Sequence, residues 1–572
     1  MEYQKEYCMG VPGYAGSAFS DRVQHWSQVD WRRVECNVRG TQIRIAKATQ
    51  EGDLRRAKAL QRMLTRSLSA KLLAVRRVTE NQGRRTAGVD GELWSTPAFR
   101  LKACTRLESR GYRPMPLRRV FIPKANGKQR PLGIPTMTDR AMQALYQLAL
   151  DPLVESISDP NSYGFRRNRS TTDAGAQLFI ALAKKRSPYW VLEADIEGCF
   201  DHISHDWLVE HVPMDRTMLR KWLKAGVVFN GEFQSTDAGT PQGGIISPTL
   251  ANAALNGLEA GLHRYLKEKL GYRKHHSAGV NVVRYADDFV VTGATSELLR
   301  NEVLPWVRAF LQKRGLNLSA EKTRIVHITH GFDFLGWNVR KFGHKLLIRP
   351  SAKNIRAFYA KVRAIVMRHK AVKQVDLIQL LNPLLKGWAN YHRGMVAAKT
   401  YQRLDHLMFR LLWRWARRRH QKKGARWVKD KYFPDLSSRT WTFACIERLP
   451  DGSVATRRLY WLAETPIRRH VKVRSTYHPY DREHELYGER LRQQRMAEDM
   501  RHRKQWVSMY LAQRGRCLLC DQAITRTTGW NDHAIVSRVE GGSHAVSNRV
   551  LLHPACHERV HAMRISVAKP AH

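Results

Sequence analysis

The feature that most constrains the fold is the tetrapeptide Tyr285-Ala286-Asp287-Asp288, which stands between the apolar runs Val282-Val283 and Phe289-Val290-Val291. Two short apolar runs around a tight turn predict a β-hairpin, with adjacent carboxylates at its tip. Crowded carboxylates repel each other, and a cation between them relieves the repulsion. An Asp-Asp pair also fits an ordinary solvated turn, so this pattern alone leaves both interpretations open.

A third carboxylate upstream favours a metal site. Residues 191–196 predict a strand, Asp195 stands near its end, and Phe200 follows five residues later. Between the two acidic strands lies a Gly/Pro-rich segment, 239–248, which contains Gln242 and leads into an apolar helix. Glycines allow a backbone to approach a ligand closely. Three carboxylates that hold two divalent metal ions are what phosphoryl transfer requires, so the pattern predicts a nucleotide polymerase.

This order of motifs resembles the reverse transcriptases, and segments 121–135, 162–167, 318–323 and 332–337 are similar to motifs of those encoded by group II introns. The resemblance runs from about residue 30 to the C-terminus. It implies that catalysis and the binding of two Mg²⁺ ions rest on Asp195, Asp287 and Asp288, with Ile196 included in the metal site.

The resemblance also assigns the nucleotide pocket. Asn126-Gly127 is a hairpin-turn signal that predicts Lys124 and Arg130 close to one another. In this family the matching cations hold the triphosphate of the dNTP, although both residues also fit ordinary surface cations on a hairpin. Phe200 is expected under the ribose, Gln242 in the nucleotide pocket, and Lys322 as proton donor to pyrophosphate.

The composition indicates a polyanionic partner. The 572 residues carry a formal net charge of +48, which is spread over several regions and points to RNA, DNA or both. A chain of this length should hold several domains. It has eight cysteines, too few for a disulfide framework. They favour a reducing compartment, and the sequence shows neither a signal peptide nor an apolar run of roughly 18 residues. We therefore expect a protein of the bacterial cytosol, without a membrane partner, that associates with the nucleoid when bound to target DNA.

Periodicity and the resemblance together divide the chain into five regions. Residues 51–80 predict one long basic amphipathic helix. The helical pattern after residue 350 contains the segment 387–392, which resembles the maturase thumb, or domain X. In segment 409–420 Trp and Arg are interleaved. The aromatic rings could stack on bases while the arginines pair with phosphates, or Leu411, Leu412 and Trp415 could form a buried face with the arginines outside. Both interpretations can hold, for opposite faces of one helix. The expected regions are an N-terminal basic helical extension (1–99), fingers and palm (100–345), a thumb (346–435), a DNA-binding region (436–505), and an HNH endonuclease (506–572).

The C-terminal region contains two sets of metal-ligating residues. Cys517-Leu518-Leu519-Cys520 and His553-Pro554-Ala555-Cys556 each separate two ligands by two residues, the spacing of a zinc knuckle. His557 and His561 stand four residues apart, on one face of a predicted helix. Asp532-His533 and Asn548 lie between the two halves of the knuckle.

This second set resembles the ββα-metal site of the His-Asn-His nucleases. The resemblance implies one catalytic Mg²⁺ bound by Asp532, His557 and His561, with His533 as general base and Asn548 orienting it. The structural Zn²⁺ would be held by Cys517, Cys520, His553 and Cys556. The alternative is that all of these residues bind structural zinc only.

We therefore expect an α+β multidomain fold, with right-hand fingers and palm, an α-helical thumb and a small ββα-metal domain with a zinc knuckle. The expected function is that of a multifunctional group II intron-encoded protein: RNA-directed DNA polymerase, maturase, and endonuclease for target-primed reverse transcription. Its partners would be intron RNA, target DNA and dNTPs, and the sequence sets no oligomeric state. The alternatives are a host-domesticated or defence-type reverse transcriptase that makes cDNA without mobility, and an RNA chaperone with decayed sites.

Overall fold

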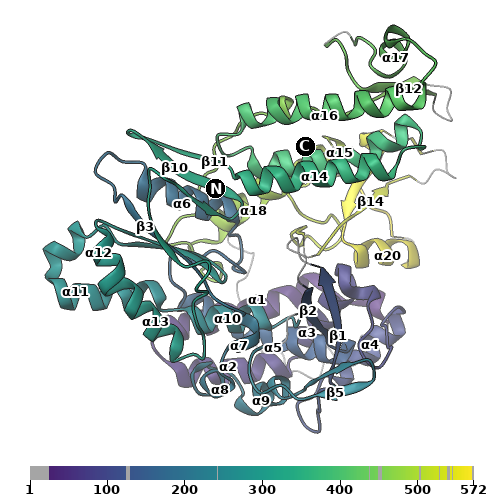
Figure 1. Ribbon diagram of the computed structural model, residues 1–572. Coiled ribbons are helices and arrows are strands. Elements are labelled where there is room, and N and C mark those ends of the chain that lie inside the picture. Colours follow the sequence, from purple (N-terminus) through teal and green to yellow (C-terminus); the bar gives the residue numbers. More distant parts are fainter. Residues whose placement is uncertain are drawn as a thin grey trace, which may run out of the picture.

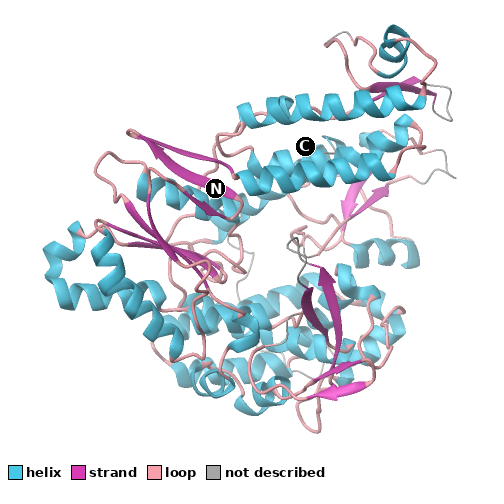
Figure 2. Cartoon of the chain, viewed as in Figure 1, coloured by secondary structure: helices cyan, strands magenta, loops and turns pink. Residues whose placement is uncertain are grey.

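The computed structural model describes residues 25–123, 129–240, 243–436, 439–448, 454–500, 504–526, 528–536, 542–543, 545–563 and 565–569. The chain is a mixed α/β protein (Figures 1 and 2). In Figure 1 the N-terminal helices lie at the bottom and long helices cross the top. The C-terminal unit, which is the described part of residues 504–569, lies between them at the right. Within the described segments, no helix combines the length and apolar character that a membrane span requires.

The N-terminal part is a helical unit packed on α5 (Met137–Ser156). It contains η2 (Trp26–Gln28), α1 (Trp31–Gln50), α2 (Leu54–Arg66), α3 (Leu68–Glu80), η3 (Gln82–Arg85) and α4 (Pro97–Arg106). The prediction of one helix over 51–80 is wrong, because the chain bends at Ser67. Ser67 has an extended backbone, and its side chain accepts the hydrogen bond of Ala70 N–H, as an N-cap does.

Two four-stranded sheets follow. The first has the order β2-β1-β4-β5, and the second, which we call the central sheet, has the order β6-β7-β3-β8. The first consists of β1 (Leu117–Pro123), β2 (Gln129–Ile134), β4 (Val227–Phe229) and β5 (Glu232–Gln234). The central sheet consists of β3 (Trp190–Asp195), β6 (Asn281–Tyr285), β7 (Asp288–Gly293) and β8 (Arg324–His327).

The central sheet is buried on both faces, which explains its continuous apolar runs. Val191, Val283 and Val290 belong to one core, and Leu192, Val282 and Val291 belong to the other. The helix α6 (Thr171–Leu182) packs on the first of these faces through Ala174 and Leu178.

The remaining elements before the third sheet are helical. They are α7 (Cys199–His202), α8 (His205–His211), α9 (Arg216–Leu223), α10 (Ser247–Leu255), α11 (Leu258–Ser277), α12 (Ser296–Leu298), η4 (Leu299–Val303) and α13 (Leu304–Gln312). A third sheet of order β11-β10-β9 contains β9 (Phe332–Phe334), β10 (Trp337–Phe342) and β11 (Lys345–Pro350).

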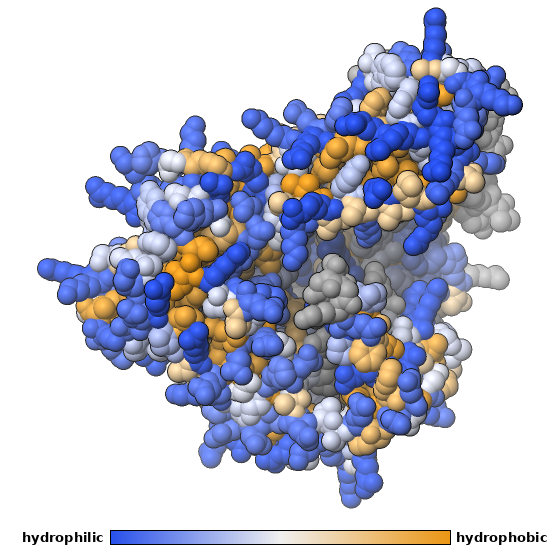
Figure 3. All heavy atoms as spheres, viewed as in Figure 1, coloured by the Kyte–Doolittle hydropathy of each residue, from blue (hydrophilic) through white to orange (hydrophobic). Residues whose placement is uncertain are grey.

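A helical bundle follows, with α14 (Ala352–Arg368), α15 (Gln374–His392), α16 (Ala398–Arg419) and α17 (Ala425–Tyr432). Helix α16 has a buried apolar face and an exposed arginine face, as its sequence suggested. Leu411, Leu412 and Trp415 are buried, whereas Arg410 and Arg414 are exposed. Hydrophilic side chains project along much of the outline of the molecule on the face shown in Figure 3.

Beyond the bundle, the chain forms β12 (Ala444–Arg448), β13 (Val454–Arg458), η5 (Leu462–Glu464) and α18 (Glu485–Asp499). Residues 468–495, which we call the strap, run back over α6. Asp173 of α6, whose side chain is fully buried, accepts hydrogen bonds from Val473 N–H, His470 Nε2 and Arg495 Nη2, each at 2.9 Å. Asp173 therefore joins the strap to the central region.

We expect Asp173→Asn to loosen the strap, because removal of one charge from a buried ion pair costs about 3–5 kcal/mol. Burial alone would raise the pKa of Asp173, but the hydrogen bond from His470 and the charge of Arg495 lower it to about 2. The stabilisation is therefore present above the unfolded-state pKa of about 3.9 and is lost only as the pH falls through 2. Limited proteolysis at pH 7 should cut the strap of this variant faster than that of the wild type. The exposed Asp206→Asn is the control, and equal cleavage of all three proteins would contradict the assignment.

Candidate active sites

Three carboxylates meet at one end of the central sheet. Asp195, the last residue of β3, is the register partner of Asp288, the first residue of β7. Asp287 stands beside them in the two-residue turn that connects β6 and β7, where Ala286 has a left-handed backbone (φ 59°). The structure thus brings together the carboxylates that the sequence placed on separate strands. The Ile196 side chain next to Asp195 is buried, so only its carbonyl could face a bound cation.

The electrostatics of this site are those of crowded, partly buried acids. Burial, the hydrogen bond with Asp195 and the charge of Asp287 raise the pKa of Asp288 to about 7. Burial also raises the pKa of Asp287, and Asp195 adds to that shift. Lys322 Nζ donates to Asp195 Oδ2 at 2.6 Å and offsets part of the negative charge. A group of acids that resists ionisation in this way fits divalent cations.

The turn that carries Asp287 rests on a buried arginine. Arg284 is 1% exposed and donates to the carbonyl of Ala286 at 3.3 Å and to the side-chain oxygens of Asn252 and Asn256, each at 3.2 Å. Gly164 lies so close that a Cβ there would meet Ala286 N at 2.3 Å. Only glycine therefore fits beneath this turn.

The described residues contain part of the predicted nucleotide pocket. Arg130 is exposed on β2 opposite Ile122. Burial raises the pKa of Asp287, and the charge of Arg130 offsets part of that rise, so Arg130 lies within electrostatic reach of the carboxylates. Phe200 lies in α7, with its ring 6.0 Å from that of Phe165. Phe165, which the sequence did not single out, thus lies beside the predicted site residue Phe200. Lys124 and Gln242 lie outside the described residues, so their predicted roles stay predictions.

A second feature near the N-terminal helices is a groove of about 760 Å³ between α2, α5 and α9. Its floor is apolar, with Met142, Leu145 and Tyr146 among the lining residues. We call it the basic groove because cations line it, from Lys58, Arg62, Arg66, Lys71, Arg110 and Arg216. This arrangement suits a phosphodiester backbone with an apolar or aromatic group beneath it.

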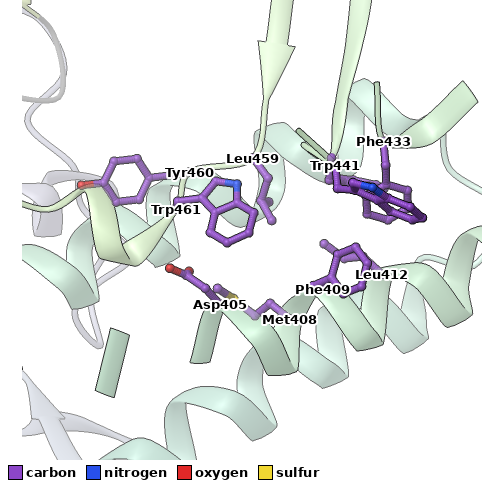
Figure 4. A pocket seen from close by; sticks show the side chains of 10 residues that line it. Asp405, Met408, Phe409, Leu412, Phe433, Trp441, Leu459, Tyr460 and Trp461 are labelled. Carbon is purple, nitrogen blue, oxygen red and sulfur yellow. The ribbon is translucent and has the colours of Figure 1, made fainter. Parts of the chain in front are cut away.

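The helical bundle contains a much smaller cavity, shown in Figure 4. Trp441, Phe433 and Phe409 line it together with Asp405, and its space is only about 10 Å³. A cavity of that size has room for no more than about one water molecule. It belongs to the packing of the bundle.

The C-terminal unit contains the predicted set of four metal ligands, which we call the knuckle. Cys517, Cys520, His553 and Cys556 are all buried, and their ligand atoms lie within 4.8 Å of one another. The first two follow α19 (Lys504–Ala512), and the others stand at the end of β15 (Arg549–Leu552) and in α20 (Pro554–Met563). Three thiols and one imidazole at this separation fit a tetrahedral zinc site.

The knuckle docks on the N-terminal helices. Arg76 of α3 is buried, with ion pairs of 3.1 Å to Glu35 and Glu80, and it lies within electrostatic reach of Cys520 and Cys556. Nearby, Arg100 of α4 pairs with Glu558 of α20 at 3.0 Å. The N-terminal unit and the C-terminal unit are therefore parts of one packed body.

A second possible metal site, which we call the His cluster, lies beside the knuckle in a ββα arrangement of β14 (Asn531–Ala534), β15 and α20. It consists of His533, His557 and His561, whose ligand atoms lie within 4.8 Å of one another. Burial, with the charges of His557 and His561, lowers the pKa of His533, which favours the neutral form of its ring. A neutral imidazole can accept a proton or bind a metal ion.

The structure does not bring Asp532 into the His cluster, although the sequence had grouped it with His557 and His561. Successive residues of a strand point to opposite faces, and Asp532 instead pairs with both the Nε and the Nη2 of Arg549 and accepts the Trp506 indole N–H at 2.9 Å. Three imidazoles favour a transition metal over the Mg²⁺ that the acidic ligand suggested.

Asn548, in η8 (Val546–Asn548), fastens the loop between the two strands of the C-terminal unit. Its side chain bonds both the N–H and the carbonyl of Val536, each at 2.9 Å, and donates to the Ser543 carbonyl. These contacts fix the chain just beyond β14, which carries His533. Asn548 is thus linked, through the backbone of Val536, to the strand that carries His533.

Four protein families match the chain in succession. "N-terminal domain of reverse transcriptase" matches residues 26–107, and "Reverse transcriptase (RNA-dependent DNA polymerase)" matches 122–339. "Group II intron, maturase-specific domain" matches 355–433, and "HNH endonuclease" matches 517–563. The matched ranges contain the central sheet, the helical bundle, the knuckle and the His cluster.

Several known proteins are similar over long stretches. Protein YkfC of Escherichia coli (strain K12) is 36% identical over 300 residues, 46% of this chain and 78% of that protein. Group II intron-encoded protein LtrA of Lactococcus lactis subsp. cremoris is 28% identical over 364 residues, 52% of this chain and 59% of LtrA. A 91 kDa protein in the cob intron of Schizosaccharomyces pombe is 27% identical over 455 residues, 64% of this chain and 54% of that protein. The match thus spans less than two thirds of the last two proteins. The chain belongs to the group II intron-encoded proteins, and it is a reverse transcriptase and maturase with an HNH endonuclease domain.

Proposed function

We propose that the chain acts in a ribonucleoprotein with group II intron RNA, in the cytosol. It assists splicing, nicks target DNA and extends the new 3′ end by copying RNA. The observation that carries this proposal is the pairing of Asp195 with Asp288 beside Asp287, on a chain that also bears the His cluster. A stand-alone cDNA synthesiser would need the carboxylates alone, so the maturase and HNH matches favour the mobile-intron function.

In this proposal the β1–β2 hairpin belongs to the fingers, the central sheet is the palm, and α14–α17 form the thumb. Asp195, Asp287, Asp288 and the Ile196 carbonyl would hold two Mg²⁺ ions. Such ions, when bound, activate the attacking 3′-oxygen and stabilise the leaving pyrophosphate. Arg130 and Lys124 bind the triphosphate, Phe200 lies under the ribose, and Gln242 lines the pocket. Lys322, at 2.6 Å from Asp195, supplies the proton to pyrophosphate.

Maturase activity rests on RNA binding and is independent of the carboxylates. The basic groove offers cations over an apolar floor, and α16 presents exposed arginines beside its buried face. Contacts of this kind bind phosphates and shape a folded RNA without metal chemistry.

For the nuclease we propose His533 as general base, with Asp532, His557 and His561 as ligands of one catalytic metal ion and Asn548 supporting the loop beyond His533. This requires the Asp532–Arg549 ion pair to open and Asp532 to turn from the opposite face of β14 toward the His cluster. The His cluster favours a second arrangement, in which His533 replaces Asp532 as a metal ligand. In both, the knuckle binds Zn²⁺ and stabilises the domain without taking part in cleavage.

Asp287→Ala should reduce primer extension on an RNA template by about 100-fold or more, because a ligand of the cations that stabilise transition-state charge is lost. The same protein should still promote intron splicing at low magnesium. The measurements are extension of a pre-annealed primer and a splicing assay on the intron RNA. Substantial extension by the variant would refute the metal assignment, and loss of splicing with intact RNA affinity would refute the separation of roles.

A second variant tests RNA binding separately from polymerase chemistry by reversing the charge of two residues of the basic groove. Lys58→Glu with Arg62→Glu should weaken RNA binding and splicing, with a shallower salt dependence of affinity, because two phosphate contacts are lost. Extension of a short pre-annealed primer should remain close to the wild-type rate. Unchanged RNA affinity would remove the groove from the RNA-binding surface.

The raised pKa of Asp288 predicts that the active site costs stability. The folded state holds the proton of Asp288 more tightly than the unfolded state does, because the folded-state pKa is about 7 and the unfolded-state pKa is about 3.9. The stability that this carboxyl contributes is therefore fully present below a pH of about 3.9 and is lost as the pH rises through about 7. Without divalent cations, Asp288→Asn should therefore melt higher than the wild type at pH 8. The two proteins should melt alike at pH 4. The exposed Glu321→Gln should show no such pH-dependent difference, and a lower melting temperature of Asp288→Asn at pH 8 would contradict the prediction.

The nuclease assignment is tested by one residue from each metal set. His533→Ala should slow nicking of target DNA by about 10²–10⁴-fold, the usual contribution of a general base, while zinc content stays unchanged. Cys517→Ser should lose zinc and with it the fold of the domain. His533→Ala should not affect extension of a pre-annealed primer.

Titration of the His cluster with Mn²⁺ or Co²⁺ separates the two arrangements. If His533 is the general base, the affinity for the added metal ion should be lost in Asp532→Ala and kept in His533→Ala. The reverse result would make His533 a ligand and leave Asp532 as the partner of Arg549. Nicking by His533→Ala at the wild-type rate would exclude both.

A further inference from the structure

Phe165 is an aromatic residue that packing alone does not explain. It is 53% exposed, and its backbone is left-handed at φ 59°, a conformation that costs free energy for a bulky side chain. Its ring lies edge-on to that of Phe200, with centroids 6.0 Å apart and planes at 76°. A strained, exposed aromatic beside a site residue calls for a functional explanation.

The chain on both sides of Phe165 is fixed to buried groups. On one side, Tyr163 N–H donates to the Arg284 carbonyl at 2.9 Å, and the Gly164 carbonyl accepts from Asn252 Nδ2 at 2.9 Å. Gly164 also touches the turn that carries Asp287. The backbone before Phe165 is therefore held by Arg284 and Asn252, the residues that also hold the turn of Asp287 in place.

On the other side, Arg166 is locked in a buried pair with Glu155. Its Nε and Nη2 donate to the two carboxylate oxygens at 2.8 and 2.7 Å, and its Nη1 donates to the carbonyls of Asp159 and Ser162. Both side chains of the pair are 5% exposed. With both neighbours anchored, the strained backbone persists and the Phe165 ring is held next to Phe200.

Phe200 itself is held from a different direction. It lies in the short helix α7 just after Asp195, and its carbonyl accepts the Thr240 N–H at 2.6 Å, which ties it to the loop that leads to Gln242. This contact fixes the backbone of Phe200 and leaves the direction of its ring to side-chain neighbours. Phe200 packs in part against the main hydrophobic core, and Phe165 is the ring that contacts it among the described aromatic pairs.

We propose that Phe165 is a positioning residue for sugar selection: it braces the ring of Phe200 and so keeps the space beside the ribose too narrow for a 2′-hydroxyl. This rests on the proposed place of Phe200 under the ribose. The ligand is the nucleoside triphosphate, and the effect is discrimination between deoxyribonucleotides and ribonucleotides. An unbraced Phe200 ring can turn aside, so the pocket would admit both sugars.

Phe165→Gly is the informative variant, because glycine adopts a left-handed backbone without strain and removes only the ring. We expect its selectivity for dNTP over rNTP, measured as the ratio of kcat/KM values, to fall by about three- to tenfold, the range of one aromatic pair. The change should lie mainly in the KM values, with kcat for the dNTP close to wild type. Phe165→Tyr, which keeps the ring, should retain the wild-type selectivity.

Phe179→Ala is the matched control, since Phe179 on α6 is 51% exposed and its loss should leave selectivity unchanged. Phe200→Ala is the benchmark. If Phe200→Ala relaxes selectivity and Phe165→Gly does not, the bracing role is overturned while the place of Phe200 stands. If Phe200→Ala itself leaves selectivity unchanged, the proposed place of Phe200 fails, and the inference fails with it.

The double variant distinguishes bracing from direct contact. If Phe165 acts through Phe200, Phe165→Gly should cause no further loss of selectivity in the Phe200→Ala background. A loss that multiplies with that of Phe200→Ala would mean that Phe165 acts independently of Phe200, and it would overturn the positioning role.

Discussion

The repulsion between Asp195 and Asp288 is the constraint on which the surrounding structure depends. Antiparallel register puts both at one end of the central sheet, and burial holds the pKa of Asp288 near 7. Such a pair would splay apart on a loose hairpin. Here the turn is fixed from below by Arg284 and by the close approach of Gly164. The stability that these acids cost is offset by the packing of the sheet between two cores.

A second consequence of this arrangement is that few parts of the chain are independent. One hydrophobic core continues from the N-terminal helices through the central sheet to the C-terminal unit. The strap is joined to α6 by Asp173, and α20 is joined to α4 by the Arg100–Glu558 pair. The nuclease is therefore held at a fixed place on the body that carries the polymerase site.

Local patterns in the sequence predicted the parts of the sites that depend on local structure. The strands that carry Asp195 and Asp288, the knuckle spacing and the two faces of α16 follow from apolar periodicity and ligand spacing. Partners far away in the chain could not be predicted. Asp532 pairs with Arg549, which lies 17 residues later on the neighbouring strand. The course of the strap depends on the buried Asp173, about 300 residues earlier. The helix expected over 51–80 breaks at Ser67 because a cap outweighs an apolar repeat that continues past it.

Helix α3 contacts both the basic groove and the C-terminal unit, and this constrains how the sequence of such a protein can evolve. Lys71 lines the basic groove, while Arg76 and Glu80 lie beneath the knuckle. A descendant that lost the C-terminal unit would uncover a buried arginine–glutamate network and the apolar surface around it. Its α3 would then have to acquire polar residues on that side while it kept the cation that faces the groove. Loss of the nuclease should therefore leave a record in a helix more than 400 residues away in the sequence.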